Sequence, residues 1–180
     1  MSVTRYLSAV SVCFGLATLM GCAQVKPTQG TIQQVGTKND DFEIILRPGW
    51  KREDSTELYG WENGVDGQEI VISVLRSEKP MDAELRSTTA KGLMDIRVNS
   101  IKDISGGKAN LSNIEPTETA DGVELAVRGV DPANGIQIYT AVVVHQRRAV
   151  SLSFYKYPPL MTDEAFRETS NAVRSALKVY

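Results

Sequence analysis

The sequence predicts an α+β domain in which two main helices pack on a single antiparallel β-sheet of about six to seven strands. Seven segments with apolar residues at strand spacing are separated by short turns rich in Gly, Pro, Asn and Asp. Two other segments have the 3.6-residue periodicity of amphipathic helices. Because the strand connections are short, consecutive strands are expected to run antiparallel.

Three strands are expected before the first helix. Residues 42–47 alternate apolar and polar side chains until Pro48-Gly49, which ends the strand. A short strand over residues 57–61 precedes the Asn63-Gly64 and Asp66-Gly67 turns of a hairpin, which leads into residues 68–76. Both faces of that last segment are partly apolar, which predicts a central strand covered on each side.

A long helix is expected over residues 81–103, with Gly106-Gly107 ending it. Projected at 100° per residue, its charged side chains form a narrow stripe opposite a broad apolar arc, so we expect extensive burial. The arc contains Leu85, Leu93, Met94, Ile96, Val98 and Ile101.

Four further strands are expected over residues 109–115, 123–130, 136–146 and 149–157, joined by turn-like links. Their alternating apolar residues predict one shared inner face. That face would contain Val123, Leu125, Val127, Ile136, Ile138, Val150, Leu152 and Phe154.

The closing helix is the clearest element of the sequence. Thr162 is the expected N-cap, and Met161 and Phe166 are spaced as a hydrophobic staple. Acidic residues come first and basic residues last, which complements the helix dipole. Phe166, Val173 and Leu177 share its apolar side, so this helix should dock on the sheet.

The segment FEIILRPGW, the strand order after it and the amphipathic closing helix resemble the PsbP-like superfamily. That superfamily includes photosystem II extrinsic proteins and DcrB-type bacterial envelope lipoproteins, and the resemblance covers residues 42–180. It implies a PsbP-like fold that serves as a non-enzymatic binding or assembly module. No metal-ligand pattern of that superfamily can be matched residue by residue to this sequence.

The N-terminus resembles a bacterial lipoprotein signal. Arg5 precedes an uncharged apolar run over residues 7–20, which is too short to span a bilayer. The run ends in Leu19-Met20-Gly21-Cys22, which looks like a lipobox. We therefore expect residues 1–21 to be a signal peptide and Cys22 to be the lipid attachment site. Ala23, where an Asp would resemble an inner-membrane retention signal, favours the outer membrane facing the periplasm.

Residues 22–40 are expected to be the lipidated N-terminus and a flexible tether, and residues 41–180 one folded domain. Cys13 would be removed with the signal and Cys22 acylated, so no thiol remains for a disulfide. The slightly acidic balance of 20 basic against 22 acidic residues excludes a nucleic-acid-binding profile. The membrane is therefore the first expected partner, through the lipid anchor.

Sequence motifs for catalysis and cofactors are absent. His145 is the single histidine, which excludes a two-histidine metal site, and we interpret it as a surface histidine near a turn. Asp40-Asp41 and Glu53-Asp54 are interpreted as solvated loop charges. Trp50 and Trp61 follow or adjoin turns, which is typical of side chains that close the end of a core. We expect no cofactor and no catalytic role.

Tyr155 and Tyr157 are the candidate partner surface. They are offset by one from the inward series that ends at Phe154, so they should face the other side of the strand. Exposed tyrosines are enriched in protein interfaces. The alternative is that the 81–103 helix covers both rings.

The sequence therefore predicts a membrane-anchored envelope lipoprotein whose soluble domain binds another envelope protein without catalysis. A small-ligand or metal-binding envelope lipoprotein is the alternative, and an enzyme is the third.

Overall fold

The computed structural model describes residues 35–53, 55, 58–119 and 122–180. The helices in these ranges are α2 (Ala83–Ile104) and α3 (Asp163–Ser175). The strands are β1 (Val35–Lys38), β2 (Phe42–Leu46), β3 (Lys51–Arg52), β4 (Tyr59–Asn63), β5 (Gln68–Arg76), β6 (Asn110–Leu111), β7 (Glu115–Thr119), β8 (Gly122–Asp131), β9 (Ile136–Val144), β10 (Arg148–Lys156) and β11 (Leu177–Val179).

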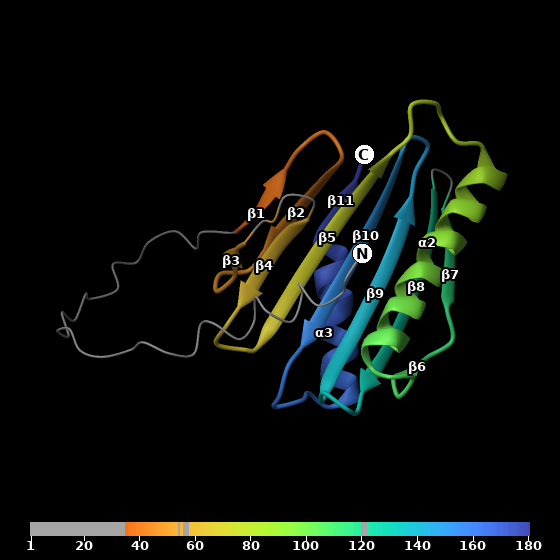
Figure 1. Cartoon of the computed structure of the whole chain (residues 1–180). Coiled ribbons are helices and arrows are strands. Elements are labelled where there is room, and N and C mark those ends of the chain that lie inside the picture. The colour runs from red at the N-terminus through yellow and green to blue at the C-terminus, as the bar shows by residue number, and fades with distance from the viewer. Residues whose placement is uncertain (1–34, 54, 56–57, 120–121) are drawn as a thin grey trace, which may run out of the picture. The chain divides into compact units, whose positions relative to one another are not determined.

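The described strands form two antiparallel sheets (Figure 1). The larger has the order β3-β4-β5-β10-β9-β8-β6, with β7 pairing β8, and the smaller has the order β1-β2-β11. The predicted α+β class, with two main helices, is confirmed. The single sheet of six to seven strands is corrected to two sheets, because the chain outside the expected strands supplies further short ones.

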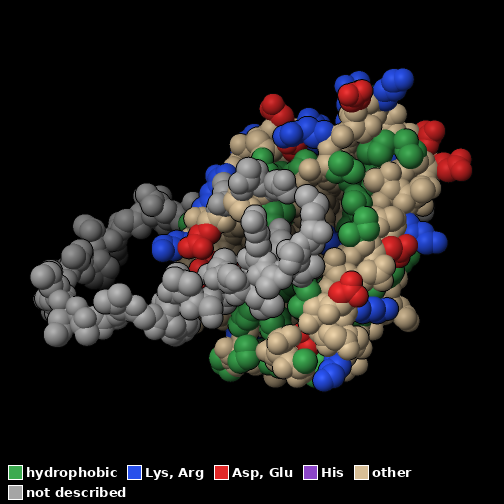
Figure 2. All heavy atoms as spheres, in the orientation of Figure 1, with side chains coloured by type: hydrophobic (Ala, Val, Ile, Leu, Met, Phe, Trp, Pro, Cys, Tyr) green, Lys and Arg blue, Asp and Glu red, His purple; other side chains and the backbone are tan. Residues whose placement is uncertain are grey.

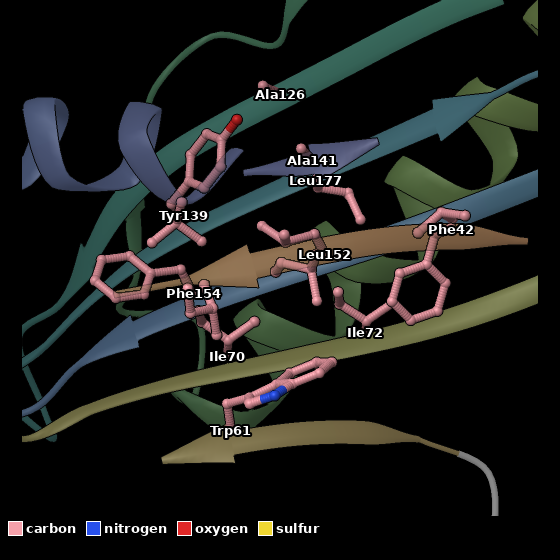
Figure 3. Packing of buried hydrophobic residues seen from close by; sticks show 14 of the residues in the cluster. Phe42, Trp61, Ile70, Ile72, Ala126, Tyr139, Ala141, Leu152, Phe154 and Leu177 are labelled. Carbon is pink, nitrogen blue, oxygen red and sulfur yellow. The ribbon is translucent and has the colours of Figure 1, made fainter. Parts of the chain in front are cut away.

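One face of the larger sheet packs against α3 and the smaller sheet (Figures 1 and 3). Phe154 of β10 is fully buried there, and its ring stacks on Phe166 of α3 with centroids 5.6 Å apart. Phe42 of β2 and Trp61 of β4 close the same cluster. This closed face supplies most of the buried apolar surface, which is the main favourable term in folding.

The opposite face packs against α2, which lies along β8 and β9 (Figure 1). Ala90 and Met94 of α2 meet Val142 and Val144 of β9 in a second buried cluster. Every residue of β9 after Ile136 is buried, because this strand is covered on both faces.

The expected single inner face is wrong. Phe154 pairs with Tyr139, and Tyr139 pairs with Arg128, so these three side chains share the α3 side. Val127, one residue earlier, therefore points to the α2 side and packs in the second cluster. The apolar series of β8 and β10 serve opposite faces of the sheet.

Several expected boundaries also change. The segment expected as a strand over residues 109–115 is split between β6 and β7, which both pair with β8. The strand expected at residues 57–61 is β4, shifted by two residues. Residues 35–38, expected in the tether, form β1 instead and pair with β2. Leu177, expected in the closing helix, begins β11.

The helix ends follow the sequence signals. Thr162 caps α3 by accepting a hydrogen bond from the Ala165 amide at 3.3 Å, as predicted. Asp82 caps α2 by accepting from the Leu85 amide at 2.8 Å. Gly106 and Gly107 follow α2 with φ of +59° and +79°, a left-handed conformation that favours glycine. Neither helix in the described ranges is long and apolar enough to cross a membrane.

Candidate binding face

Half of the α2 side of the larger sheet has no described helix over it. Figure 1 shows α2 in front of β8 and β9, whereas none of the described helices lies in front of β4, β5 and β10. We define the open face by the side chains that β5 and β10 direct to this side. They are Glu69, Val71, Ser73, Leu75, Ser151, Ser153 and Tyr155, together with Tyr157 just beyond β10.

The sequence predicted that β5 is covered on both sides, and the structure corrects this. Ile70 and Ile72 are fully buried on the closed face. On the open face Val71 and Ser73 of β5 are half-buried and Leu75 is 54% exposed, whereas Ser151 and Ser153 of β10 are buried. An apolar side chain on both faces of a strand therefore does not by itself mean that both faces are covered.

Arg97 of α2 reaches across to the open face. Its Nε donates to Ser151 Oγ at 2.9 Å and its Nη2 donates to Ser73 Oγ at 2.6 Å. Ser73 and Ser151 are directly opposite each other in the β5–β10 register, so one guanidinium joins both strands to the helix. The hydroxyls of Ser153 and Thr140 lie 3.1 Å apart on the same side.

A hollow of about 240 Å³ lies where the first turns of α2 meet the open face. Leu75 and Ala149 line it from the sheet, and Met81, Leu85 and Thr89 line it from the helix side. Arg76 and Ser77 complete its wall. The hollow is largely apolar. Because residues of both α2 and the open face line it, one side of α2 faces the open half of the sheet.

The flank of α2 beside the hollow carries exposed apolar side chains. Leu85 is 49% exposed, and Ile96, eleven residues later and so on nearly the same side of the helix, is 61% exposed. Figure 2 shows hydrophobic side chains gathered along α2 in this view. The expected extensive burial of the apolar arc is therefore only partly correct. Met94 and Ile101 are buried, whereas this flank is not.

Arg86 lies on the same flank as Arg97, eleven residues earlier. Its Nη1 donates to the Met81 carbonyl at 2.9 Å, while its buried Nε has no hydrogen-bond partner. Among the ion pairs formed by the described residues, none involves Arg86 or Arg97. Both guanidinium groups therefore border the open face without an ion pair to another described residue.

Tyr155 and Tyr157 lie at one end of the open face, and both are half-buried. Tyr157 Oη donates to Glu69 Oε2 at 2.7 Å. Burial raises the pKa of Tyr157 well above its usual value, and the Glu69 carboxylate raises it further. The Tyr157 hydroxyl is thus held in place by β5, whereas Tyr155 pairs along β10 with Ile138 and Glu69 through the backbone register.

The interpretation of Asp41 as a solvated loop charge is wrong. Asp41 is 1% exposed, and its Oδ1 accepts from Arg76 Nε and from Arg148 Nε, each at 2.9 Å. The hydrogen bond from Arg76 lowers the pKa of Asp41, burial opposes this, and Arg148 lowers it further. Arg148 also donates to the Tyr180 carbonyl at 2.8 Å. This cluster joins β2, β5, β10 and the C-terminal residue.

The other singled-out residues have structural surroundings. Trp61 is 1% exposed and Trp50 packs partly buried against the same cluster, which agrees with their interpretation as core-closing side chains. His145 follows β9 and is half-buried, with its amide donating to the Arg148 carbonyl at 2.8 Å. Glu53 is exposed. Cys22, the expected lipid attachment site, lies outside the described residues, as does Asp54.

No group of three or more metal-ligating side chains occurs within the described ranges. The polar groups on the open face are hydroxyls, two carboxylate-free guanidiniums and the hydrogen-bonded pair of Tyr157 and Glu69. They can donate hydrogen bonds and attract negative charge. The arrangement can therefore hold a negatively charged or hydrogen-bonding group of another molecule.

Sequence reasoning missed Arg86, Arg97 and the Asp41 cluster. The periodicity analysis of α2 followed its apolar arc and its charged stripe, and at 100° per residue both arginines fall within the arc, opposite the stripe. A usable signal was their spacing of eleven residues, which places both arginines on nearly the same side of the helix. For Asp41 no local signal exists, because its partners are 35 and 107 residues away.

Comparison with known proteins bears on the fold. No protein-family model matches the chain, and no curated protein matches it in sequence. Among solved structures, cyanobacterial PsbP (CyanoP) from Synechocystis sp. PCC 6803 is similar, with a TM-score of 0.62 and 14% identity over 90% of this chain and 99% of that one. The Ran-binding protein Mog1p from Saccharomyces cerevisiae has a TM-score of 0.48 and 13% identity over 83% of this chain and 96% of its own.

The similarity to CyanoP spans nearly the whole length of both chains. At this identity it shows the arrangement of the elements and not the activity. The chain therefore has a PsbP-like fold, as the resemblance of its FEIILRPGW segment and strand order implied.

Proposed function

We propose that this protein is a lipid-anchored lipoprotein of the bacterial cell envelope whose folded domain is a non-catalytic binding module. The observation that supports the binding role best is the open face, a half of the central sheet that the described helices leave uncovered, with two tyrosines at one end. Large uncovered surfaces that combine apolar and hydrogen-bonding groups are typical of interaction sites.

The lipid anchor rests on the sequence. Cys22 follows an uncharged apolar run and a small residue, which is the order that lipoprotein signals require. Two or three acyl chains hold a protein at a membrane, since each buried methylene contributes about 0.8 kcal/mol. The proposed address is the outer membrane facing the periplasm.

Labelling with radioactive palmitate tests the anchor. Cys22→Ser should abolish incorporation and release or mis-sort the protein without changing its folding. Cys13→Ser is the matched control, because it makes the same change inside the apolar run and should retain the label. Equal label on the Cys22→Ser protein and on wild type contradicts the proposal.

Tyr155 and Tyr157 remain the proposed contact with an envelope protein. Crosslinking in intact cells followed by mass spectrometry should identify a specific partner. The double change Tyr155→Ala/Tyr157→Ala should remove that crosslink, since interface anchors commonly contribute 2 kcal/mol or more. Tyr180→Ala, which removes a 44% exposed tyrosine from the opposite side of the domain core, should keep it. An unchanged crosslink in the double variant rejects the tyrosine surface.

The alternative is a small-ligand or metal-binding lipoprotein, and the sizes of two hollows bear on it. The hollow beside the first turns of α2 has a volume of about 240 Å³, below the roughly 300–1,000 Å³ of small-molecule sites, and its size suits one anchoring side chain of a partner. A second hollow of about 580 Å³, between the last turns of α2 and β6, lies within that range and is the place where a small ligand would be sought. Calorimetric titration of the purified protein with divalent metal ions and with periplasmic small-molecule extracts tests this alternative.

A further inference from the structure

The open face has a chemical character that narrows the kind of partner, and this inference rests on the proposed binding function. Three kinds of group meet beside α2. An apolar hollow lies at one end, exposed Leu75, Leu85 and Ile96 lie around and beyond it, and Arg86 and Arg97 line the helix flank.

The two arginines are the informative groups. A guanidinium remains charged at all physiological pH values and presents several donors in a fixed fork. In the described part of the chain, Asp41 pairs with Arg76 and Arg148, and Glu124 pairs with Arg174. Arg86 and Arg97 have only neutral oxygen acceptors, at Met81, Ser73 and Ser151.

Neither guanidinium forms an ion pair with a carboxylate of the described residues. The Nε of Arg86 is buried and has no hydrogen-bond partner among the described residues. The two residues are eleven apart on one helix, or about 16 Å along its axis. A partner with two acidic groups at a comparable separation would therefore complement this flank.

The size of the hollow indicates which apolar group of a partner could bind there. Its volume of about 240 Å³ accommodates a single large apolar side chain, and its walls are the side chains of Leu75, Met81 and Leu85 with Ala149. Such a pocket beside exposed apolar residues is the usual seat of an interface anchor. Next to the hollow, the hydroxyls of Ser73 and Ser151 accept hydrogen bonds from Arg97.

We propose that the open face binds a segment of another envelope protein that carries an apolar anchor residue flanked by acidic residues. The anchor occupies the hollow, and the acidic side chains pair with Arg86 and Arg97. The chain as a whole is slightly acidic, with 22 acidic and 20 basic residues, so general attraction does not explain such a preference. Local charge complementarity at the two arginines supplies it.

A random twelve-residue peptide display library, selected on the immobilised full chain, is the first test. Selected peptides should combine one large apolar residue with Asp or Glu on at least one side. Their affinity should fall as salt rises, because screening weakens charge pairing. Peptides enriched in Lys or Arg, or no enrichment at all, overturn the inference.

Variants of α2 then locate the site for one selected peptide. Arg86→Gln/Arg97→Gln should weaken binding at least tenfold, because both positive charges are lost. Lys91→Gln/Lys102→Gln is the matched control, with the same charge change on exposed positions of the same helix, and should bind within twofold of wild type. Equal weakening in both double variants, or none in either, overturns the inference.

A second pair of variants does not depend on the arginines. Leu85→Ser should weaken the peptide several-fold through the hollow, whereas Ile45→Ser, at a 43% exposed residue of the smaller sheet, should not. Phosphatidylglycerol vesicles are tested alongside. Vesicle binding that Arg86→Gln/Arg97→Gln removes, without peptide binding, identifies a lipid surface and overturns the inference. A cellular crosslink that survives the arginine changes rejects this site and leaves the proposed function standing.

Discussion

The two faces of the larger sheet differ in how they are covered, and β10 shows the difference within one strand. Val150, Leu152 and Phe154 are fully buried under α3 and the smaller sheet. Ser151 and Ser153, between them in sequence, face the other side and carry hydroxyl groups. The closed face buries apolar side chains. On the other face, β10 contributes hydrogen-bonding hydroxyl groups, and α2 covers only part of the sheet.

The closed face and the open face also differ in what they contribute to stability. The closed face gathers residues from both sheets and α3 into one cluster, so its loss would affect the whole domain. The open face contributes fewer buried apolar atoms, and it is bordered by Arg86 and Arg97, which form no ion pair with another described residue. Leu75, which is 54% exposed there, can change to suit a partner at small cost to folding.

The largest expected effect comes from the closed face. Phe154→Ala should destabilise the domain by about 3–5 kcal/mol, because it removes a fully buried ring and leaves a cavity against Phe166. Urea denaturation followed by circular dichroism measures the change. A loss below about 1 kcal/mol would mean that the closed face is not the main core.

The second effect concerns the Asp41 cluster, which ties the smaller sheet to β5 and β10. Asp41→Asn should lower the melting temperature at pH 7 by several degrees, because a buried carboxylate with two arginine partners becomes neutral. Asp40→Asn is the matched control. Its side chain is exposed and adjacent in sequence, so its melting temperature should stay near that of wild type.

The same cluster predicts a pH dependence. The folded state lowers the pKa of Asp41, so it binds that proton less tightly than the unfolded chain does. The stabilisation is therefore complete above the unfolded pKa of about 3.9 and is lost as pH falls through the lower folded value. The difference in melting temperature between wild type and Asp41→Asn should shrink as pH falls from 5 toward 3. A constant difference across this range contradicts the assignment.

A smaller effect is expected where the tyrosine pair borders the open face. Tyr157→Phe removes the hydrogen bond to Glu69 but keeps the ring, so it should cost about 1–2 kcal/mol. Because the folded state raises the pKa of Tyr157, this stabilisation is present below pH 10 and is lost as pH rises above it. Denaturation at pH 7 and pH 11 measures both values. A variant as stable as wild type at pH 7 would leave Tyr157 without a structural role.

Much of the fold was predictable because its signals are local. The alternating residues of β5 and β10, the turn over residues 64–67 and the Thr162 cap each depend on neighbours in sequence. The short strands β1 and β11 were not predictable in this way. Each exists only because β2 lies between them and pairs with both, which is a long-range condition.

The candidate site was less predictable for the same physical reason. The position of Tyr155 opposite Phe154 follows from strand alternation alone. Whether α2 covers that side depends on where the helix docks, and the sequence of α2 is apolar enough to predict wider burial than it has. The pairing of Ser73 with Ser151 under Arg97 joins three segments that are far apart in the chain.

The smallest expected effect tests whether the flank of α2 is free of a structural role. Ile96→Ser should change the free energy of unfolding by no more than about 0.5 kcal/mol, because the side chain is 61% exposed. Ile101→Ser makes the same change five residues later, where the side chain is 7% exposed, and should cost several times more. Urea denaturation of the two variants compares the two sides of one helix directly. A cost for Ile96→Ser equal to that for Ile101→Ser would mean that the flank belongs to the core, and that the larger sheet has two closed faces.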